Sequence, residues 1–180
     1  MAKLENKSKF KKINIGILGG SFDPAHQGHL SISKEALKRF NLKLIIWAIT
    51  KQNPFKKKCS NNLKKRIVSC KKLINKNKFI KVKFFEDIIN SNKTSDLINY
   101  LSKNKKYNLF FLMGADNLIN FHKWYKWKQV IKKSNILVFD RHGYKKKSLN
   151  SKTFKSLNRK LITFVDFNKV NISSSQLRKI

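Results

Sequence analysis

The sequence of 180 residues predicts a single α/β domain, with a mainly parallel, Rossmann-like sheet flanked by helices. Two observations favour this fold class: strand-like apolar runs alternate with helix-like segments, and the first run leads through a glycine loop directly into a helix. A third is that no internal repeat or low-complexity linker divides the chain. Ligands bind such sheets outside the carboxyl ends of the strands, so functional residues are expected there.

Each predicted element follows from the spacing of apolar residues. Leu63, Ile67, Cys70 and Ile74 share one helical face, whereas apolar residues alternate with lysines in 80–84. Six strands are expected, at 13–18, 42–49, 80–84, 109–113, 136–139 and 161–165. Helices are expected at 27–40, around 63–74 and from about 94, and 173–180 is compatible with another helix start. We expect a basic N-terminal tail at 1–12 and one domain at 13–180.

The charge balance is extreme, with 42 Lys and Arg against 9 Asp and Glu, a net charge of +33. Such a charge raises the alternative of a basic nucleic-acid-binding module. Only five of these residues are arginine, the usual side chain for bidentate phosphate and base contacts, and the lysines are spread over the whole chain. We therefore interpret the charge as a compositional bias that also concentrates anionic substrates near the protein. Nucleic acid is not the expected partner.

The two cysteines, Cys59 and Cys70, have neither disulfide-framework spacing nor a Cys-x-x-Cys pattern. Their spacing fits a reducing cytosol, so a cytoplasmic location is expected. It also argues against a zinc site, and no protein-held metal is predicted. No apolar run approaches the length of a membrane span, and no membrane partner is expected.

A pair of histidines, His26 and His29, follows the first predicted strand. Gly19 and Gly20 are expected to give a tight exit from that strand, where the backbone can approach a ligand. Asp23, before a proline, is interpreted as a turn residue. The histidines then lie at the start of a helix, where free N–H groups and the helix dipole favour anions. The segment therefore predicts a phosphate site.

This histidine segment resembles the HxGH signature of the nucleotidyltransferase superfamily. A second segment, Ile172-Ser173-Ser174-Ser175-Gln176-Leu177-Arg178, is similar to the I-S-S-T/S-x-x-R motif of the same superfamily. Its serines suit a helix start and Arg178 adds a forked cation, an arrangement that fits a triphosphate. An ordinary serine-capped helix is the alternative for this segment alone.

Further segments are similar to the bacterial nicotinate-nucleotide adenylyltransferases. One runs from Gly114-Ala115-Asp116-Asn117-Leu118 to Phe121, Trp124, Tyr125 and Trp127. The others are Arg141-His142-Gly143-Tyr144, similar to an R-P-G-Y element; Lys93-Thr94-Ser95-Asp96-Leu97, similar to Y-T-x-x-T-L; and Asn53-Pro54-Phe55-Lys56, where many members carry P-P-H-K. Phe55 and His142 depart from that pattern, since they replace a histidine and a proline.

The resemblance implies an adenylyltransferase of NAD biosynthesis that joins ATP and nicotinate mononucleotide into nicotinate adenine dinucleotide and releases pyrophosphate. It implies Mg²⁺ held mainly through the ATP phosphates. Catalysis is assigned to His26, His29, Lys56 and Arg178. ATP binding is assigned to Gly20, Ser21, Phe22, Asp116, Ile172, Ser173 and Ser174. The nicotinate nucleotide is assigned to Thr94, Trp124, Tyr125 and Arg141.

Several alternatives stay open at this point. Pantetheine-phosphate adenylyltransferase shares the histidine signature and is the nearest competing enzyme. Asp116 is equally compatible with a ribose-hydroxyl contact and with a helix N-cap. Trp127 is expected in the core, and Arg66 is interpreted as a surface or salt-bridging residue. A monomer and a homodimer are both compatible with the sequence.

Overall fold

Six parallel strands form one sheet in the computed structural model, which describes residues 12–53, 58–140, 143–156 and 161–166. The spatial order is β3-β2-β1-β4-β5-β6, and every pair of neighbours is parallel. The strands are β1 (Ile13–Gly20), β2 (Leu44–Ile49), β3 (Ile80–Phe84), β4 (Tyr107–Gly114), β5 (Asn135–Phe139) and β6 (Ile162–Val165). This strand order is that of a Rossmann sheet, so the predicted fold class is confirmed.

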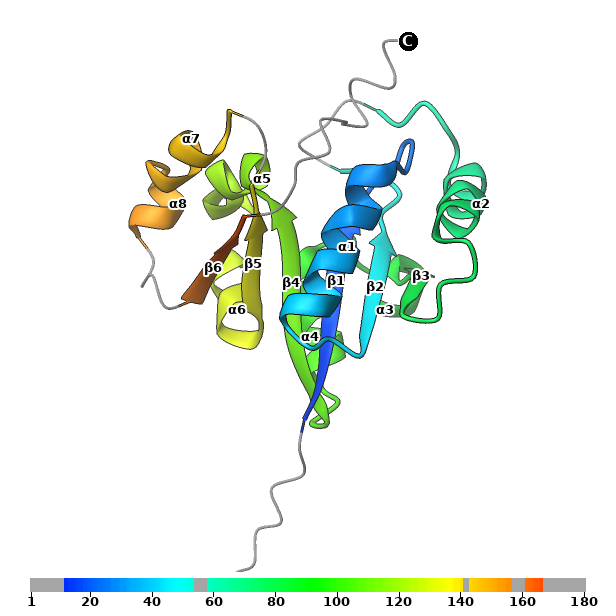
Figure 1. Cartoon of the computed structure of the whole chain (residues 1–180), viewed down its shortest axis with the longest axis horizontal. Helices are drawn as coiled ribbons and strands as arrows, with labels where there is room; N and C mark the ends of the chain where they lie inside the picture. Colours follow the sequence, from blue (N-terminus) through cyan, green and yellow to red (C-terminus); the bar gives the residue numbers. More distant parts are fainter. Residues whose placement is uncertain (1–11, 54–57, 141–142, 157–160, 167–180) are drawn as a thin grey trace, which may run out of the picture.

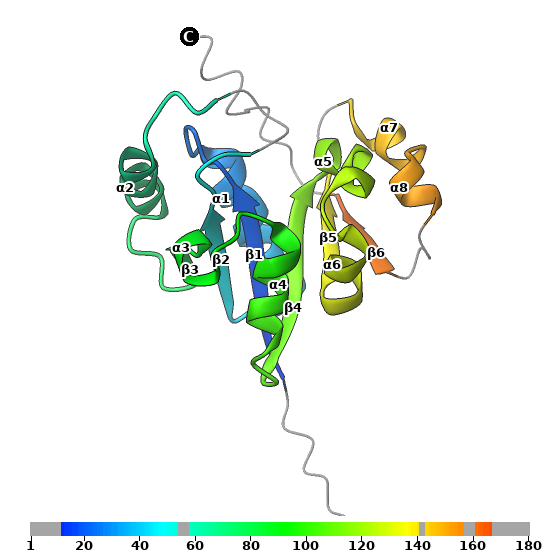
Figure 2. The same ribbon diagram turned by 180° about the vertical axis from the view of Figure 1, so that it is seen from behind.

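Helices cover both faces of the sheet (Figures 1 and 2). One face carries α1 (Gln27–Arg39) and α2 (Leu63–Ile74), and the other carries α3 (Glu86–Ile89), α4 (Thr94–Ser102) and α6 (Trp127–Lys133). Short helices pack on one another beside the ends of β4 and β5: α5 (Ala115–Ile119), η1 (Phe121–Lys123), α7 (Lys145–Leu149) and α8 (Lys152–Lys155). None of the helices in the described ranges has the length and apolar character needed to cross a membrane.

The core has two halves, one on each side of the sheet. Successive residues of a strand point to opposite faces, so Ile17 packs toward α4 and α6 while Leu18 packs toward α1 and α2. The central strands are therefore apolar on both sides. Gly16 is needed for close packing, because a Cβ there would lie 2.9 Å from side-chain atoms of Leu42 and Ile45. This packing fixes the strand ends that carry the site.

All six predicted strands are confirmed, with bounds that differ by at most two residues. The predicted helices at 27–40, around 63–74 and from 94 are confirmed as α1, α2 and α4. The five short helices α3 and α5–α8 were not predicted, because helices of four to seven residues depend on tertiary packing rather than on a repeated apolar stripe. The possible helix start at 173–180 lies outside the described residues.

Cys70 provides a test of the packing of α2. Its side chain is fully buried, and burial raises the pKa of its thiol to about 12. We expect Cys70 to resist alkylation by iodoacetamide in the folded protein and to react in urea, because only the thiolate attacks. In Cys59→Ser the remaining thiol should stay unreactive until unfolding, and rapid native labelling of that variant would contradict the packing.

The free energy of unfolding should fall as the pH rises above the ordinary pKa of a cysteine thiol, because there only the unfolded chain loses the proton of Cys70.

Candidate active site

Two histidines build the N-terminus of α1. The N-cap residue His26 has an extended backbone, and its Nδ1 accepts a hydrogen bond from the N–H of Gly28 at 3.2 Å. Nδ1 of His29 in turn accepts from the N–H of His26, also at 3.2 Å. Because both Nδ1 atoms act as acceptors, these bonds assign the hydrogen of each neutral ring to Nε2. Two Nε2–H donors thus belong to the positive end of a helix of 13 residues.

The ring of His29 is held by aromatic neighbours. Its centroid lies 4.8 Å from that of Phe22 and 5.9 Å from that of Trp47 in β2, and Phe22 and Trp47 stack at 5.0 Å. Ser33, one turn further along α1, donates to the carbonyl of His29 and accepts from the indole N–H of Trp47, both at 2.8 Å. The second strand therefore orients the histidine. Sequence reasoning missed the roles of Trp47 and Ser33.

The expectation that the chain turns out of the first strand at Gly19 and Gly20 was wrong. Both glycines belong to β1, and neither has a positive φ. The chain turns at Phe22, with φ of +49°, a conformation that costs an L-residue about 1–2 kcal/mol. Burial of the Phe22 ring against Trp47 offsets this cost. The predicted ATP contacts of Ser21 and Phe22 thus fall on a turn whose side chains are buried.

Asp23 ties this turn to the segment that precedes α2. It lies in a turn, as expected, and its carboxylate is completely buried. The carboxylate accepts hydrogen bonds from the backbone N–H groups of Ser60 (2.6 Å) and Asn61 (3.2 Å) and from the Asn61 side chain (2.9 Å). Asp23 therefore anchors the loop that leads to the histidines.

Arg66 was wrongly interpreted as a surface residue. Only 3% of it is exposed, and its guanidinium donates to backbone carbonyls at the ends of β1 and β2 and before α2. The acceptors are Ser21 (2.6 Å), Thr50 (2.8 Å), Lys51 (2.9 Å) and Asn61 (3.0 Å). Carbonyls that follow a strand end lack ladder partners, and Arg66 donates to three of them as well as to the carbonyl of Asn61. It holds the first two strand ends in one arrangement.

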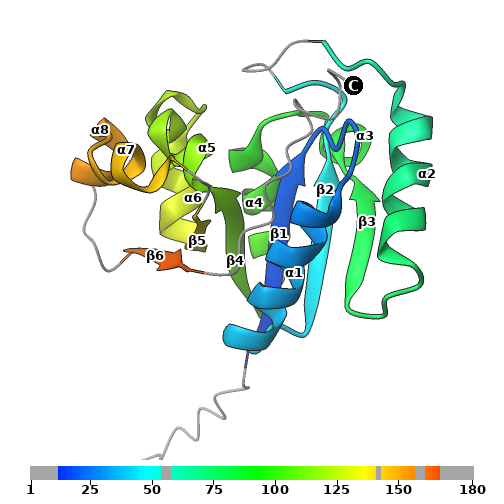
Figure 3. The same ribbon diagram turned by 45° about the horizontal axis from the view of Figure 1, so that its top comes forward.

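A cavity of about 380 Å³ lies at the carboxyl ends of β1 and β2, and its wall includes residues of α4. Figure 3 shows α4 on the side of these strands opposite to α1. It brings together four predicted site residues, namely Gly20, Thr94, Trp124 and Tyr125. Other residues of its wall include Thr50, Glu86, Phe111 and Lys123. Trp124 also packs edge-on against Phe111 and Phe121, so it is both cavity wall and core. Trp127 packs against Phe121 and borders the core, as expected.

Asp116 follows the end of β4, the strand beside β1. The alternative that Asp116 is a helix N-cap was wrong. Gly114 is the N-cap of α5, and Asp116 is in the first turn. A Cβ on Gly114 would lie 2.4 Å from Oδ1 of Asp116, so the carboxylate folds back over this glycine. Glycine at 114 therefore makes room for the acidic side chain at the strand end.

The described site has two parts that meet at Gly20. The histidine helix follows this residue in the chain, and Gly20 also lines the cavity. Its carbonyl accepts from the N–H of Thr50 at 3.0 Å. In the ranges covered by the structure, no cluster of three or more His, Cys, Asp or Glu side chains is arranged to hold a metal ion. The other predicted site residues lie outside the described residues: Lys56, Arg141, Ile172, Ser173, Ser174 and Arg178.

The fold and the histidine-capped helix are those of a nucleotidyltransferase-type protein, and comparison with known families agrees. The chain belongs to the cytidylyltransferase-like family, whose model matches residues 17–180. The predicted superfamily is thereby confirmed.

Individual proteins of known name show which members of this family the chain is similar to. A protein of Pelagibacter ubique (strain HTCC1062), named probable nicotinate-nucleotide adenylyltransferase, is 65% identical over 180 residues, the whole of both chains. A protein of the same name from Bradyrhizobium sp. (strain ORS 278) is 35% identical over 156 residues, 86% of this chain and 81% of its own. The fold is also that of Plasmodium falciparum nicotinic acid mononucleotide adenylyltransferase, solved in complex with NaAD. The TM-score is 0.73 at 20% identity, over 93% of this chain and 83% of that one.

Proposed function

We propose that this chain is a cytoplasmic adenylyltransferase of NAD biosynthesis, which joins ATP and nicotinate mononucleotide into nicotinate adenine dinucleotide and pyrophosphate. The observation that carries the proposal is the meeting, at Gly20, of a histidine-capped helix start and a cavity walled by aromatic residues. The names of the close relatives support the same reaction. We assign catalysis to a domain at 13–180, preceded by a basic tail at 1–12.

The cavity suits an anionic pyridine nucleotide. Trp124 and Tyr125 offer aromatic faces to the positively charged pyridine ring, and Thr94 begins α4 at the cavity wall. The first N–H groups of a helix have no partner within it, so the start of α4 favours the carboxylate of nicotinate. Lys93 and Lys123 in the wall add positive charge. Arg141 is a further proposed contact of this nucleotide.

The reaction needs no protein nucleophile. An oxygen of the acceptor phosphate attacks the α-phosphorus of ATP in line; the new P–O bond forms as the bond to the β-phosphate breaks, and pyrophosphate leaves with that electron pair. The acceptor phosphate is already largely ionised near neutral pH, so positioning and charge stabilisation supply the catalysis. Nε2–H of His26 and His29 would donate to phosphate oxygens, that of His29 to the α-phosphate as its charge grows.

The remaining ATP contacts are proposals on the predicted residues. Lys56 and Arg178 would neutralise the reacting and leaving phosphates. The backbone of 20–22 and of 172–174 would line the triphosphate, and Asp116 would accept from a ribose hydroxyl. Mg²⁺ would neutralise the triphosphate, held mainly by ATP oxygens and water.

The reaction is tested by incubating the protein with ATP, Mg²⁺ and a panel of acceptors: nicotinate mononucleotide, its amide and phosphopantetheine. Product masses and pyrophosphate release identify the preferred acceptor. A dinucleotide product supports the proposal, and turnover of phosphopantetheine alone would favour the competing enzyme. A salt-dependent RNA gel shift without pyrophosphate release would favour the nucleic-acid-binding module.

We expect the acid nucleotide to be preferred over its amide by about a hundredfold in kcat/KM. The carboxylate accepts from the N–H groups at the start of α4, whereas a carboxamide turns its NH₂ toward them and leaves donors unpaired. Two such mismatches at about 1–3 kcal/mol each produce a preference of this size. The measurement is kcat/KM for both acceptors at one salt concentration, and near-equal values would contradict acid specificity but not adenylyl transfer.

A further inference from the structure

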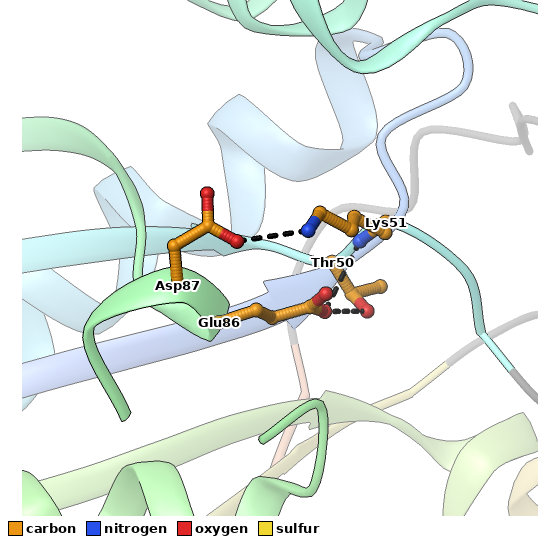
Figure 4. A network of polar contacts seen from close by, with 4 residues as sticks. All are labelled: Thr50, Lys51, Glu86 and Asp87. Carbon is orange, nitrogen blue, oxygen red and sulfur yellow. Dashed lines mark hydrogen bonds and ion pairs between the residues drawn. The ribbon is translucent and has the colours of Figure 1, made fainter. Parts of the chain in front are cut away.

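One acidic side chain in the cavity wall has no role in the reaction described above. Glu86 is the first residue of α3 and is half-buried in the wall. Figure 4 shows its carboxylate turned toward the end of β2, where the hydroxyl of Thr50 and the backbone N–H of Lys51 (3.1 Å) both donate to Oε1. These bonds fix the position of the carboxylate.

The second oxygen of Glu86 is not used by the protein. Within the described ranges, Oε2 makes no hydrogen bond and no ion pair, since both bonds of the carboxylate go to Oε1. The ammonium of Lys51, whose backbone N–H donates to Glu86, is 2.8 Å from Asp87 instead (Figure 4). A carboxylate oxygen that makes no hydrogen bond and no ion pair is unfavourable in a cavity for an anionic nucleotide unless the ligand supplies a donor.

The place of Glu86 indicates which part of the ligand this donor belongs to. Thr50 donates to Glu86 through its hydroxyl, and its backbone N–H donates to the carbonyl of Gly20, beside the phosphate-binding helix start. Glu86 is therefore linked through Thr50 to Gly20, on the proposed phosphate side, and it lines the same cavity as Thr94 and Trp124, on the proposed pyridine side. In a nucleotide, the ribose connects these two parts, and its hydroxyl groups are donors.

We propose that Glu86 is a specificity-determining residue, whose Oε2 accepts a hydrogen bond from a ribose hydroxyl of the acceptor nucleotide. This inference rests on the proposed function. It explains how a carboxylate is compatible with an anionic acceptor, because the carboxylate binds the uncharged middle of the ligand. It also predicts selection for ribosyl acceptors over phosphate esters that lack the hydroxyl.

Glu86→Gln isolates this contact. The glutamine Oε1 still accepts from Thr50 and Lys51, so the bonds to the strand end are kept and only Oε2 is replaced. We expect KM for nicotinate mononucleotide to rise about tenfold to a hundredfold, with kcat and KM for ATP within about twofold of the wild type. The matched control is Asp87→Asn, the next carboxylate in α3, which pairs with Lys51 and does not line the cavity; its KM should change less than about twofold.

Deoxy acceptors identify the hydroxyl. With one of the two analogues, the 2′-deoxy or the 3′-deoxy nucleotide, kcat/KM of the wild type should fall by a factor similar to the one that Glu86→Gln causes. The same analogue should cause no further fall in Glu86→Gln, as a double-mutant cycle requires for the two partners of one contact. An unchanged KM in Glu86→Gln, or additive losses with both analogues, would overturn the assignment. If Glu86→Gln does not fold, as judged by circular dichroism, a wild type indifferent to both deoxy analogues overturns it as well. Absence of wild-type turnover would instead refute the proposed function.

Discussion

Replacing His29 by asparagine is expected to lower kcat by about two to three powers of ten while the protein stays folded. The asparagine side-chain oxygen occupies the region of Nδ1 and can still accept the N–H of His26, so the start of α1 keeps its cap. The donor at the Nε2 position is lost, and with it the proposed stabilisation of charge on the α-phosphate. The predicted effect is therefore on the rate of transfer and much less on folding.

A matched variant, His29→Gln, separates the donor from the ring. Its side-chain amide reaches the region of Nε2 and can donate there, so part of the lost kcat should return, whereas the cap is weakened. The measurements are kcat from pyrophosphate release at saturating substrates and the thermal midpoint of each variant. A folded His29→Asn protein with kcat within about tenfold of the wild type would contradict the assigned role.

Arg66→Met is expected to lower the free energy of unfolding by about 3 kcal/mol or more. The variant keeps most of the apolar stem but leaves the carbonyls of Ser21, Thr50, Lys51 and Asn61 without their donor. Each buried acceptor that loses its partner costs about 1–3 kcal/mol, reduced where water can enter. KM for ATP should also rise, because Ser21 belongs to the proposed triphosphate contacts.

Urea denaturation measures this effect through the shift of the midpoint. Lys65→Met, on the exposed face of the same helix, is the control and should change stability by less than about 0.5 kcal/mol. Equal midpoints for the two variants would mean that the guanidinium contributes nothing to the strand ends.

The fold was predictable because its signals are local. Central strands buried on both faces are continuous apolar runs, and Ile13–Gly20 and Tyr107–Gly114 carry such runs in the sequence. The anchors of the site were not predictable in this way. Arg66 acts on carbonyls as far away in the chain as Ser21, and no local pattern of charges separates such a buried arginine from a solvated one.

The candidate site residues were selected mainly from motifs, and the histidine pair also from its place at a helix start. The histidine pair, Thr94, Trp124 and Tyr125 all belong to recognised segments, and the structure brings the last three to one cavity. Residues that act on these positions from other elements were missed. Trp47 resembles any core aromatic of a strand, and Glu86 resembles any surface acid after one, because their partners are defined only by the folded chain.

The four bonds of Arg66 have a consequence for how the two substrates affect each other. One guanidinium joins the turn at Ser21, on the proposed ATP side, to the carbonyls of Thr50 and Lys51, on the proposed acceptor side. A ligand that moves or stiffens one of these two strand ends therefore acts on the other strand end through the rigid guanidinium of Arg66. Any such coupling is reciprocal: if bound acceptor strengthens ATP binding, bound ATP must strengthen acceptor binding by the same factor. Arg66 would then carry cooperativity between substrates as well as stability.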